Sequence, residues 1–166
     1  MGMNIMRMKG RAKMMRTIKV TVHSREEYDR IKLPERSTRC SAGYDFYLPH
    51  DIVIPYGRST TIATGIRVIL DDDKFLMLCP RSGLGFKYGI SLANTCGIVD
   101  ADYCLSDNEG HIFVKLVNNS PLANGEDIKL KEGSAFCQGI ICRYYETDQD
   151  ETDAIRNGGF GSTDKK

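Results

Sequence analysis

The chain lacks the features that mark several common protein classes. No stretch approaches the roughly 20 apolar residues of a membrane-spanning helix, so no membrane partner is expected. Its formal net charge is only +1, which removes the general electrostatic drive for binding nucleic acid. It has three histidines, and its six cysteines form no Cys-x-x-Cys pair, so a zinc site is not expected. The Walker signature is absent too, which excludes P-loop chemistry.

What is present is the composition of one soluble domain. Hydrophobic residues make up 41% and charged residues 27% of the 166 positions, which suits a proper core and an ordinary polar surface. Several cysteines, such as Cys79 and Cys142, lie in apolar runs typical of strands. We therefore expect reduced, buried thiols in a cytoplasmic protein rather than disulfides.

Three stretches of the chain differ in composition. Residues 1–16 are basic and rich in methionine, and we expect a flexible leader or an upstream start rather than a targeting peptide. Residues 17–145 carry the hydrophobic patterns of a folded domain. Residues 146–166 are polar and rich in glycine, which by composition alone is typical of a flexible tail.

Short alternating apolar runs predict strands through the middle of the chain. A first strand is expected at 17–23, followed by a helical turn that Ser24 caps, with Glu27 three residues on, and that ends near Pro34. Residues 36–42 are expected to form a loop. Further strands are expected at 51–54, 59–63, 66–70, 74–79, 111–117, around 128, and 135–145. Many short strands between glycine and proline turns indicate an all-β sandwich or barrel.

Four segments carry more chemistry than connecting loops need, namely 41–45, 80–85, 97–103 and 156–163. In the second, Arg81, Ser82 and Gly83 combine a guanidinium fork, a hydroxyl and open backbone amides, which suit phosphate oxygens. The last repeats these groups and adds Phe160, an aromatic ring with no core to fill, which suits a planar ligand. Taken singly, each segment is equally an ordinary turn or a tail with a chance aromatic.

Carboxylates complete this set of groups. Asp100 and Asp102 could supply a general base for water and a structural acceptor, and Asp45 could help to anchor a hydrated metal ion. Each is also compatible with a solvated turn. Together, phosphate donors, an aromatic platform and carboxylates are what hydrolysis of a nucleoside triphosphate requires.

In this order the four segments resemble motifs one, two, three and five of the trimeric dUTPase family, and residues 133–138 resemble motif four. The resemblance spans about 17–163. It implies a jelly-roll-like β-barrel with a flexible C-terminal arm, assembled as a homotrimer in which each active site draws on three subunits. It also implies Mg²⁺-dependent hydrolysis of dUTP to dUMP and pyrophosphate, which limits uracil in DNA and supplies dUMP for thymidylate synthesis.

The resemblance also implies roles for residues of the third motif. Asp100 matches the family's general base, which orients a water to attack the α-phosphorus. Asn94, with the hairpin backbone around Gly97 and Ile98, should read the uracil edge. Tyr103 should pack on the deoxyribose and leave no room for a 2′-hydroxyl.

The other motifs are implied to hold the phosphates and the metal. Arg81, Ser82 and Gly83 should hold α- and β-phosphate oxygens, and Gln138 should support phosphate or water. Asp45 would act on Mg²⁺ through a metal-bound water, while the triphosphate itself chelates the ion. The closing arm would bind the γ-phosphate and cover the base through Arg156, Phe160, Gly161, Ser162 and Thr163.

The chain departs from the family pattern at four places. Residues 104–110 look like a small insertion, and Ala135 stands where motif four usually has Arg. Arg156 is one residue closer to Phe160 than is common, and Asp164 replaces a final glycine. The base, the phosphate loop and the aromatic residue of the arm all remain, so activity is still expected.

Two other functions compete with this interpretation. A dCTP deaminase needs a glutamate as general acid and base in the strand after the motif-three hairpin, where this chain has Lys115. A regulatory protein could use the trimer as a binding platform, with 105–110 as the candidate insert. Ammonia release from dCTP and pyrophosphate release from dUTP discriminate among the three.

Overall fold

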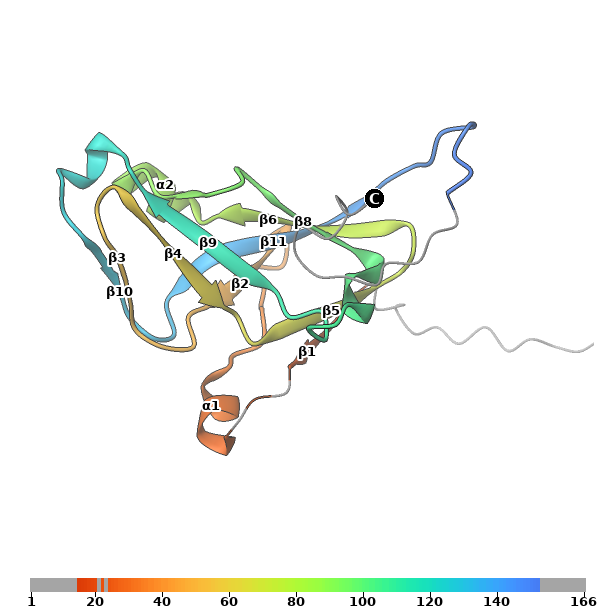
Figure 1. The fold of residues 1–166 in the computed structure, drawn as a ribbon, viewed down its shortest axis with the longest axis horizontal. Coiled ribbons are helices and arrows are strands. Elements are labelled where there is room, and N and C mark those ends of the chain that lie inside the picture. Colours follow the sequence, from red (N-terminus) through yellow and green to blue (C-terminus); the bar gives the residue numbers. More distant parts are fainter. Residues whose placement is uncertain (1–14, 21, 23, 153–166) are drawn as a thin grey trace, which may run out of the picture.

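A computed structural model describes residues 15–20, 22 and 24–152 and shows the all-β architecture that the sequence predicts (Figure 1). One sheet has the order β2-β11-β6-β8, and a second has the order β4-β9-β7. These strands are β2 (Gly43–Tyr47), β4 (Arg58–Ala63), β6 (Lys74–Pro80), β7 (Ser91–Leu92), β8 (Gly97–Asp100), β9 (Phe113–Asn118) and β11 (Ala135–Arg143).

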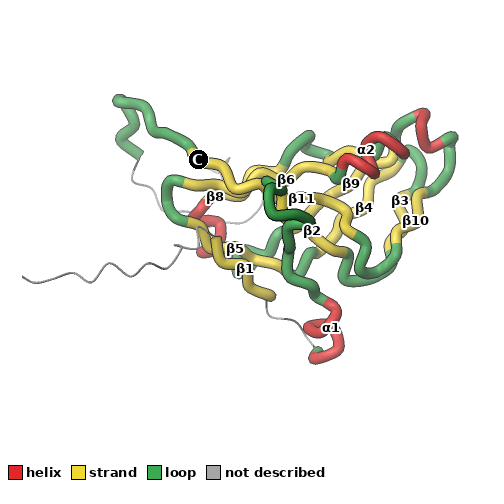
Figure 2. Tube along the Cα trace, turned by 180° about the vertical axis from the view of Figure 1, so that it is seen from behind, coloured by secondary structure: helices red, strands yellow, loops and turns green. Residues whose placement is uncertain are grey.

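Smaller elements extend the two sheets (Figure 2). Two antiparallel pairs join β1 (Met15–Lys19) to β5 (Ile66–Leu70) and β3 (Ile52–Ile54) to β10 (Ile128–Leu130). The helical elements are α1 (Arg25–Arg30), α2 (Ser82–Tyr88), η1 (Ala101–Leu105) and η2 (Pro121–Ala123). The ladders of the described residues leave the sheets separate and do not close them into one barrel. None of these helices has the length and apolar character to cross a bilayer.

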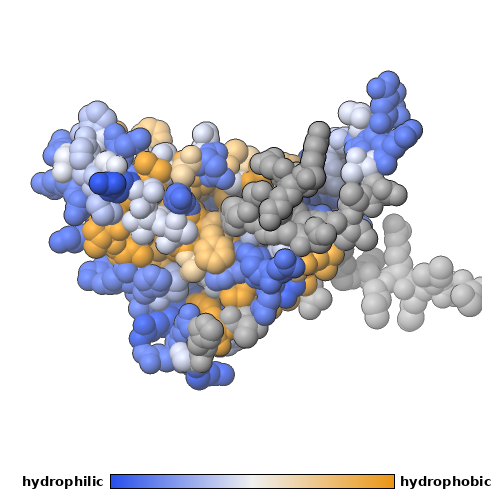
Figure 3. Space-filling model, in the orientation of Figure 1, coloured by the Kyte–Doolittle hydropathy of each residue, from blue (hydrophilic) through white to orange (hydrophobic). Residues whose placement is uncertain are grey.

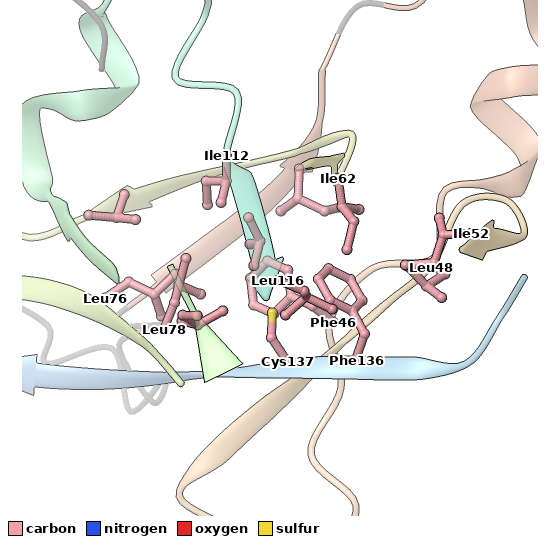
Figure 4. Close-up of a cluster of buried hydrophobic side chains, with 14 of the residues drawn as sticks. Phe46, Leu48, Ile52, Ile62, Leu76, Leu78, Ile112, Leu116, Phe136 and Cys137 are labelled. Carbon is pink, nitrogen blue, oxygen red and sulfur yellow. The ribbon is translucent and has the colours of Figure 1, made fainter. Parts of the chain in front are cut away.

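The core lies between the two larger sheets, and strand alternation fills it (Figure 4). In β6, Leu76 and Leu78 are buried, while Met77 between them is less buried. Ile62 of β4 and Leu116 of β9 belong to the same core from the other sheet, and both are fully buried. Each such side chain contributes about 1.5–3 kcal/mol when it leaves water, so the alternating strands are held face to face.

Strand β11 has a glycine at a close contact within the core. A Cβ on Gly139 would lie 2.9 Å from Leu76 Cδ1 and 2.9 Å from Phe46 Cε2. Only glycine therefore lets the Phe46 ring and the Leu76 side chain close over the middle of β11.

Most predicted strands are confirmed within a residue or two, and so is the capped helix. Ser24 Oγ accepts a hydrogen bond from the Glu27 amide at 3.1 Å, although α1 ends at Arg30, before Pro34. The first strand also ends earlier than predicted, at Lys19.

Strand β2 and helix α2 are among the elements that were not predicted. Strand β2 buries the consecutive residues Asp45 and Phe46, so its sequence lacks the alternation of apolar and polar residues that marks a strand. Helix α2 was interpreted as a loop, because its seven residues contain two glycines, which are poor helix formers.

The cysteines follow the prediction in one respect and not in another. All six are unpaired, as predicted. The prediction that they are buried was wrong except for Cys137, since Cys40 is exposed and the other four are partly exposed. Cys40 lies in a surface loop, and Cys142 lies near the end of β11, where the sheet is less covered.

Replacement of Gly139 by alanine tests the packing of β11. We expect Gly139→Ala to lower the free energy of unfolding by about 1–3 kcal/mol, because its Cβ overlaps two core side chains. Urea denaturation measures this change. The matched control is Gly85→Ala in α2, whose Cβ would meet nothing closer than Ile90 O at 3.8 Å. That control should lose no stability and gain up to about 1 kcal/mol.

Candidate functional site

Three of the predicted site segments meet at the C-terminal end of β6. The Arg81 guanidinium, directly after β6, forms an ion pair through Nη1 with Oδ2 of Asp45 on β2. The Ser37 hydroxyl donates to the same oxygen at 2.7 Å. Asp45 is only 6% exposed, so this ion pair anchors the Arg81 side chain to a buried group. The other nitrogens of the Arg81 guanidinium remain available to a ligand.

The electrostatics of Asp45 follow from these contacts. Burial alone would raise the pKa of its carboxyl group. The hydrogen bonds from Arg81 and Ser37, together with the charges of Arg81 and Lys32, outweigh burial, and the pKa lies below its ordinary value. Asp45 is therefore held as a carboxylate. Sequence analysis overlooked Ser37, which no motif distinguishes from other loop serines.

Gln138 joins the same cluster from β11. It stands opposite Asp45 in β2 and opposite Cys79 in β6, and its Nε2 donates to Pro80 O at 3.4 Å. A Cβ on Gly43 would lie 2.5 Å from Gln138 Oε1, so the first glycine of segment 41–45 makes room for this side chain. The first, second and fourth predicted motifs thus converge on one end of the main sheet.

Ser82 and Gly83 form the first turn of α2 beside Arg81. Both are exposed, and the amides of a first helical turn have no acceptor within the helix. A Cβ on Gly83 would meet nothing within 4 Å in a single chain, so its surroundings here impose no steric need for glycine. The group as a whole offers a guanidinium, a hydroxyl and open amides, which can hold an anion.

Asn94 lies in the loop between β7 and β8, which was predicted as a hairpin, and Gly97 and Ile98 begin β8. All three line a pocket of about 410 Å³. The turn is tight, since Cys96 N donates to Asn94 O at 2.7 Å and Thr95 has a φ of 66°. A Cβ on Gly97 would come within 3.2 Å of Leu78 Cβ, so glycine allows β8 to pack closely on β6. The pocket is mostly apolar with a few polar groups, as sites for planar ligands are.

Asp100 ends β8 and lines a different pocket, of about 640 Å³. Asp102 of η1, Asp72 and Tyr144 line it too. The Tyr144 hydroxyl donates to Asp72 O at 2.6 Å, and burial together with nearby carboxylates, Asp100 among them, raises the pKa of Tyr144. Sequence analysis missed Tyr144, because only the tertiary fold brings the end of β11 to this pocket.

Tyr103 is largely enclosed, with 5% of its surface exposed. Its hydroxyl donates to His111 O at 2.9 Å, and Asn108 Nδ2 donates to that hydroxyl at 3.0 Å and to His111 O at 3.2 Å. Asn108 Oδ1 accepts from Gly110 N at 3.2 Å. The predicted insertion at 104–110 is thus a built turn that packs against Tyr103 through Asn108, whose importance no sequence pattern indicated.

The two halves of the predicted site lie at opposite ends of β6. Asp100 stands opposite Phe75, whereas Pro80 stands opposite Cys137 next to Gln138. Six residues separate Phe75 from Arg81, which in a strand is about 20 Å. Figure 1 shows the same separation, with α2 at one end of the molecule and the short green helix after β8 at the other. The two groups are therefore well separated along the sheet of one chain.

The closing motif lies outside the described residues, and so do its predicted site residues Arg156, Phe160, Gly161, Ser162 and Thr163. Among the residues that are described, no group of three or more His, Cys, Asp or Glu side chains could hold a metal ion. Asp45 directs Oδ2 to Arg81 and Ser37.

Replacement of Asp45 tests the buried pair with Arg81. We expect Asp45→Asn to cost about 1–3 kcal/mol of unfolding free energy at pH 7, because Arg81 and Ser37 lose a charged acceptor. Because the pKa of Asp45 is lower in the folded protein, its carboxylate stabilises the fold at pH values above the ordinary carboxyl pKa. This stabilisation is lost as the pH falls through the pKa of the folded state. The deficit should therefore shrink below about pH 4.

Urea denaturation at several pH values measures this deficit. The control is Asp148→Asn, an exposed loop acid, which should change stability by less than about 0.5 kcal/mol. A deficit in Asp45→Asn that stays constant from neutral to acid pH would contradict the assignment of a carboxylate pair.

Known proteins share this sequence pattern. The chain matches the profile of the dUTPase family over residues 29–164. It is 34% identical over 136 residues to the deoxyuridine 5′-triphosphate nucleotidohydrolase of Lactococcus lactis, covering 80% of this chain and 88% of that protein. The Rickettsia felis protein of the same name is 38% identical over 138 residues, with 79% and 87% covered.

Solved structures share the fold. The dUTPase of Streptococcus mutans matches with a TM-score of 0.67 at 28% identity, covering 80% of this chain and 98% of that one. A mutant dUTPase of phage phi11 of S. aureus, whose structure reveals the coordination of a structural Mg(II) ion, matches with a TM-score of 0.64. It is 18% identical, with 84% of this chain and 97% of that one covered, and supports the fold alone. The jelly-roll-like fold is confirmed, and the chain belongs to the dUTPase family.

Proposed function

We propose that this dUTP diphosphatase cleaves dUTP to dUMP and pyrophosphate with Asp100 as the general base, at sites shared between subunits. The family and its curated relatives support the coarse activity, hydrolysis of dUTP. The observation that carries the finer proposal is the distance of about 20 Å along β6 between the end that holds Arg81 and the end that faces Asp100. A second copy of the chain must supply the missing half.

In the proposed step, the Asp100 carboxylate accepts a proton from a water as that water attacks the α-phosphorus. The new bond joins the water oxygen to the α-phosphorus, and the bond from this phosphorus to the bridging oxygen breaks. Pyrophosphate leaves with the electron pair, and dUMP remains. The pocket at the end of β8, where Asp100 is partly buried beside Asp102, gives room for water and substrate.

The phosphates would be held by the residues at the C-terminal end of β6, supplied by another subunit. Arg81, Ser82 and Gly83 would donate to α- and β-phosphate oxygens, with Gln138 supporting phosphate or water. Mg²⁺ bound to the triphosphate would neutralise charge on its oxygens. Arg81 and Ser37 contact Oδ2 of Asp45, and its Oδ1 would accept a hydrogen bond from a metal-bound water.

The base and sugar would lie against the hairpin of the subunit that provides Asp100. Asn94 and the backbone around Gly97 and Ile98 would read the uracil edge, and Tyr103 would exclude a 2′-hydroxyl. The arm would then close over the substrate, with Phe160 covering the base. Its γ-phosphate ligands would be Arg156, Gly161, Ser162 and Thr163. We propose that three copies form this enzyme in the cytoplasm, where it would limit uracil in DNA and supply dUMP.

Replacement of Asp100 tests the general base. We expect Asp100→Asn to lower kcat for dUTP by about 10²–10⁴-fold while nucleotide binding persists, because an amide cannot accept the proton. Pyrophosphate release and calorimetric titration measure the two properties. The control Asp107→Asn removes an exposed carboxylate of the adjacent turn and should keep full activity. Equal activity of Asp100→Asn and the wild type, or ammonia release from dCTP, would overturn the proposal.

Mixing two inactive variants tests whether sites are shared. Arg81→Ala and Asp100→Asn should each be inactive alone but regain about one quarter of wild-type activity after unfolding and refolding together. Random assembly then places an intact Arg81 beside an intact Asp100 from another chain at about one site in four. Light scattering gives the oligomeric state. Activity that never exceeds the sum of the two variants would contradict a shared site.

A further inference from the structure

The pocket beside the β7–β8 hairpin forms where the two main sheets part. Strand β8 is the edge of one sheet and β7 is the edge of the other, and the hairpin bridges them. Leu78 and Leu92 line the apolar part of the pocket, and Phe113 of β9 lines it as well. Figure 3 shows the face over β4 and β9, with hydrophobic residues gathered in its middle and hydrophilic ones to the sides.

Lys115 of β9 brings a charge to this pocket. The Ala93 amide donates to Lys115 O at 2.9 Å, which extends the β7–β9 ladder by one residue. Lys115 therefore lies beside the residue that precedes Asn94. Thr61 of β4 is directly opposite Lys115 in the ladder, so the two side chains share one face of the sheet.

Among the residues that the structure describes, no carboxylate forms an ion pair with the ammonium group of Lys115 or lines this pocket, and Lys115 is the one charged residue in the lining. Within the part of the chain that the structure describes, the lysines in ion pairs are Lys32, Lys74 and Lys131. Lys115 is exposed and lines a mostly apolar pocket, so its ammonium group can bind a ligand oxygen without breaking an ion pair within the described residues.

We propose that Lys115 selects the base by donating a hydrogen bond to the carbonyl oxygen at C4 of uracil. The inference rests on the proposed function, because it places the base of dUTP against this hairpin. It adds a specificity residue that no motif of the sequence indicated for this role.

The chemistry of the two pyrimidines explains why a lysine discriminates. Uracil presents an acceptor oxygen at C4, whereas cytosine presents an amino group that donates. An ammonium group has three donors and no acceptor, so it pairs with uracil and opposes cytosine. Asn94 can turn its amide to offer either a donor or an acceptor, and the Thr61 hydroxyl can do both. Among the polar side chains of the pocket, only Lys115 cannot adapt to cytosine.

The test compares kcat/KM for dUTP and dCTP in wild type, Lys115→Met and Lys115→Arg. We expect Lys115→Met to lower the dUTP-to-dCTP ratio by about 10- to 100-fold, mainly through a higher KM for dUTP. Lys115→Arg keeps donors at this position and should keep most of the preference. Lys115→Glu supplies an acceptor instead and should lower the ratio further.

A control and a binding measurement separate this inference from the proposed function. Lys129→Met removes an exposed lysine on β10, opposite Val53 and away from the pocket, and should leave the ratio unchanged. Calorimetry with dUMP and dCMP reports base preference without catalysis, and thermal denaturation verifies folding of each variant.

The outcomes are distinct. Normal dUTP hydrolysis with an unchanged ratio in Lys115→Met would overturn the role of Lys115 and leave the proposed function standing. Absence of dUTP hydrolysis in the wild type would overturn the proposed function, and equal binding of dUMP and dCMP would then overturn the role of Lys115 as well.

Discussion

The antiparallel register of β6 with its two neighbours constrains every other part of the site. Its C-terminal end delivers Arg81 to Asp45 and Gln138, and its N-terminal part stands opposite Asp100. A slip of one residue would turn each buried side chain to the wrong face, so the register is strongly held by the core. The groups that suit phosphate and the carboxylate that suits water are therefore kept about 20 Å apart in one chain.

Each half of the site is supported by polar contacts beneath it. Asp45 and Ser37 orient Arg81, and the cost of burying this carboxylate is offset by a charged partner and a hydroxyl. Asn108 supports Tyr103 from the turn that departs from the family pattern. The insertion thus has a local structural role, while the exposed Leu105 at its start leaves a surface role for a partner open to experiment.

The pocket lined by Asn94 and Lys115 is mostly apolar, unlike the polar clusters around Arg81 and Tyr103. It lies where the edge strands of the two sheets meet, and three polar residues are part of its lining. The sequence predicts Lys115 at the position at which a deaminase would need a glutamate. In our proposal, the same position supplies a donor that prefers uracil.

The sequence by itself determined the all-β class and most strand positions, because alternation and turn residues are local signals. It also predicted four segments as candidates for the chemistry. It did not reveal β2, in which a polar residue and an apolar residue are buried in succession, or the glycine-rich helix α2. Only the tertiary structure decided that Ser37 and Gln138 meet at Asp45, that Tyr144 and Asn108 adjoin the site, and that Arg81 and Asp100 lie apart. These are consequences of strand register and sheet order, which depend on contacts between distant residues and leave no pattern along the chain.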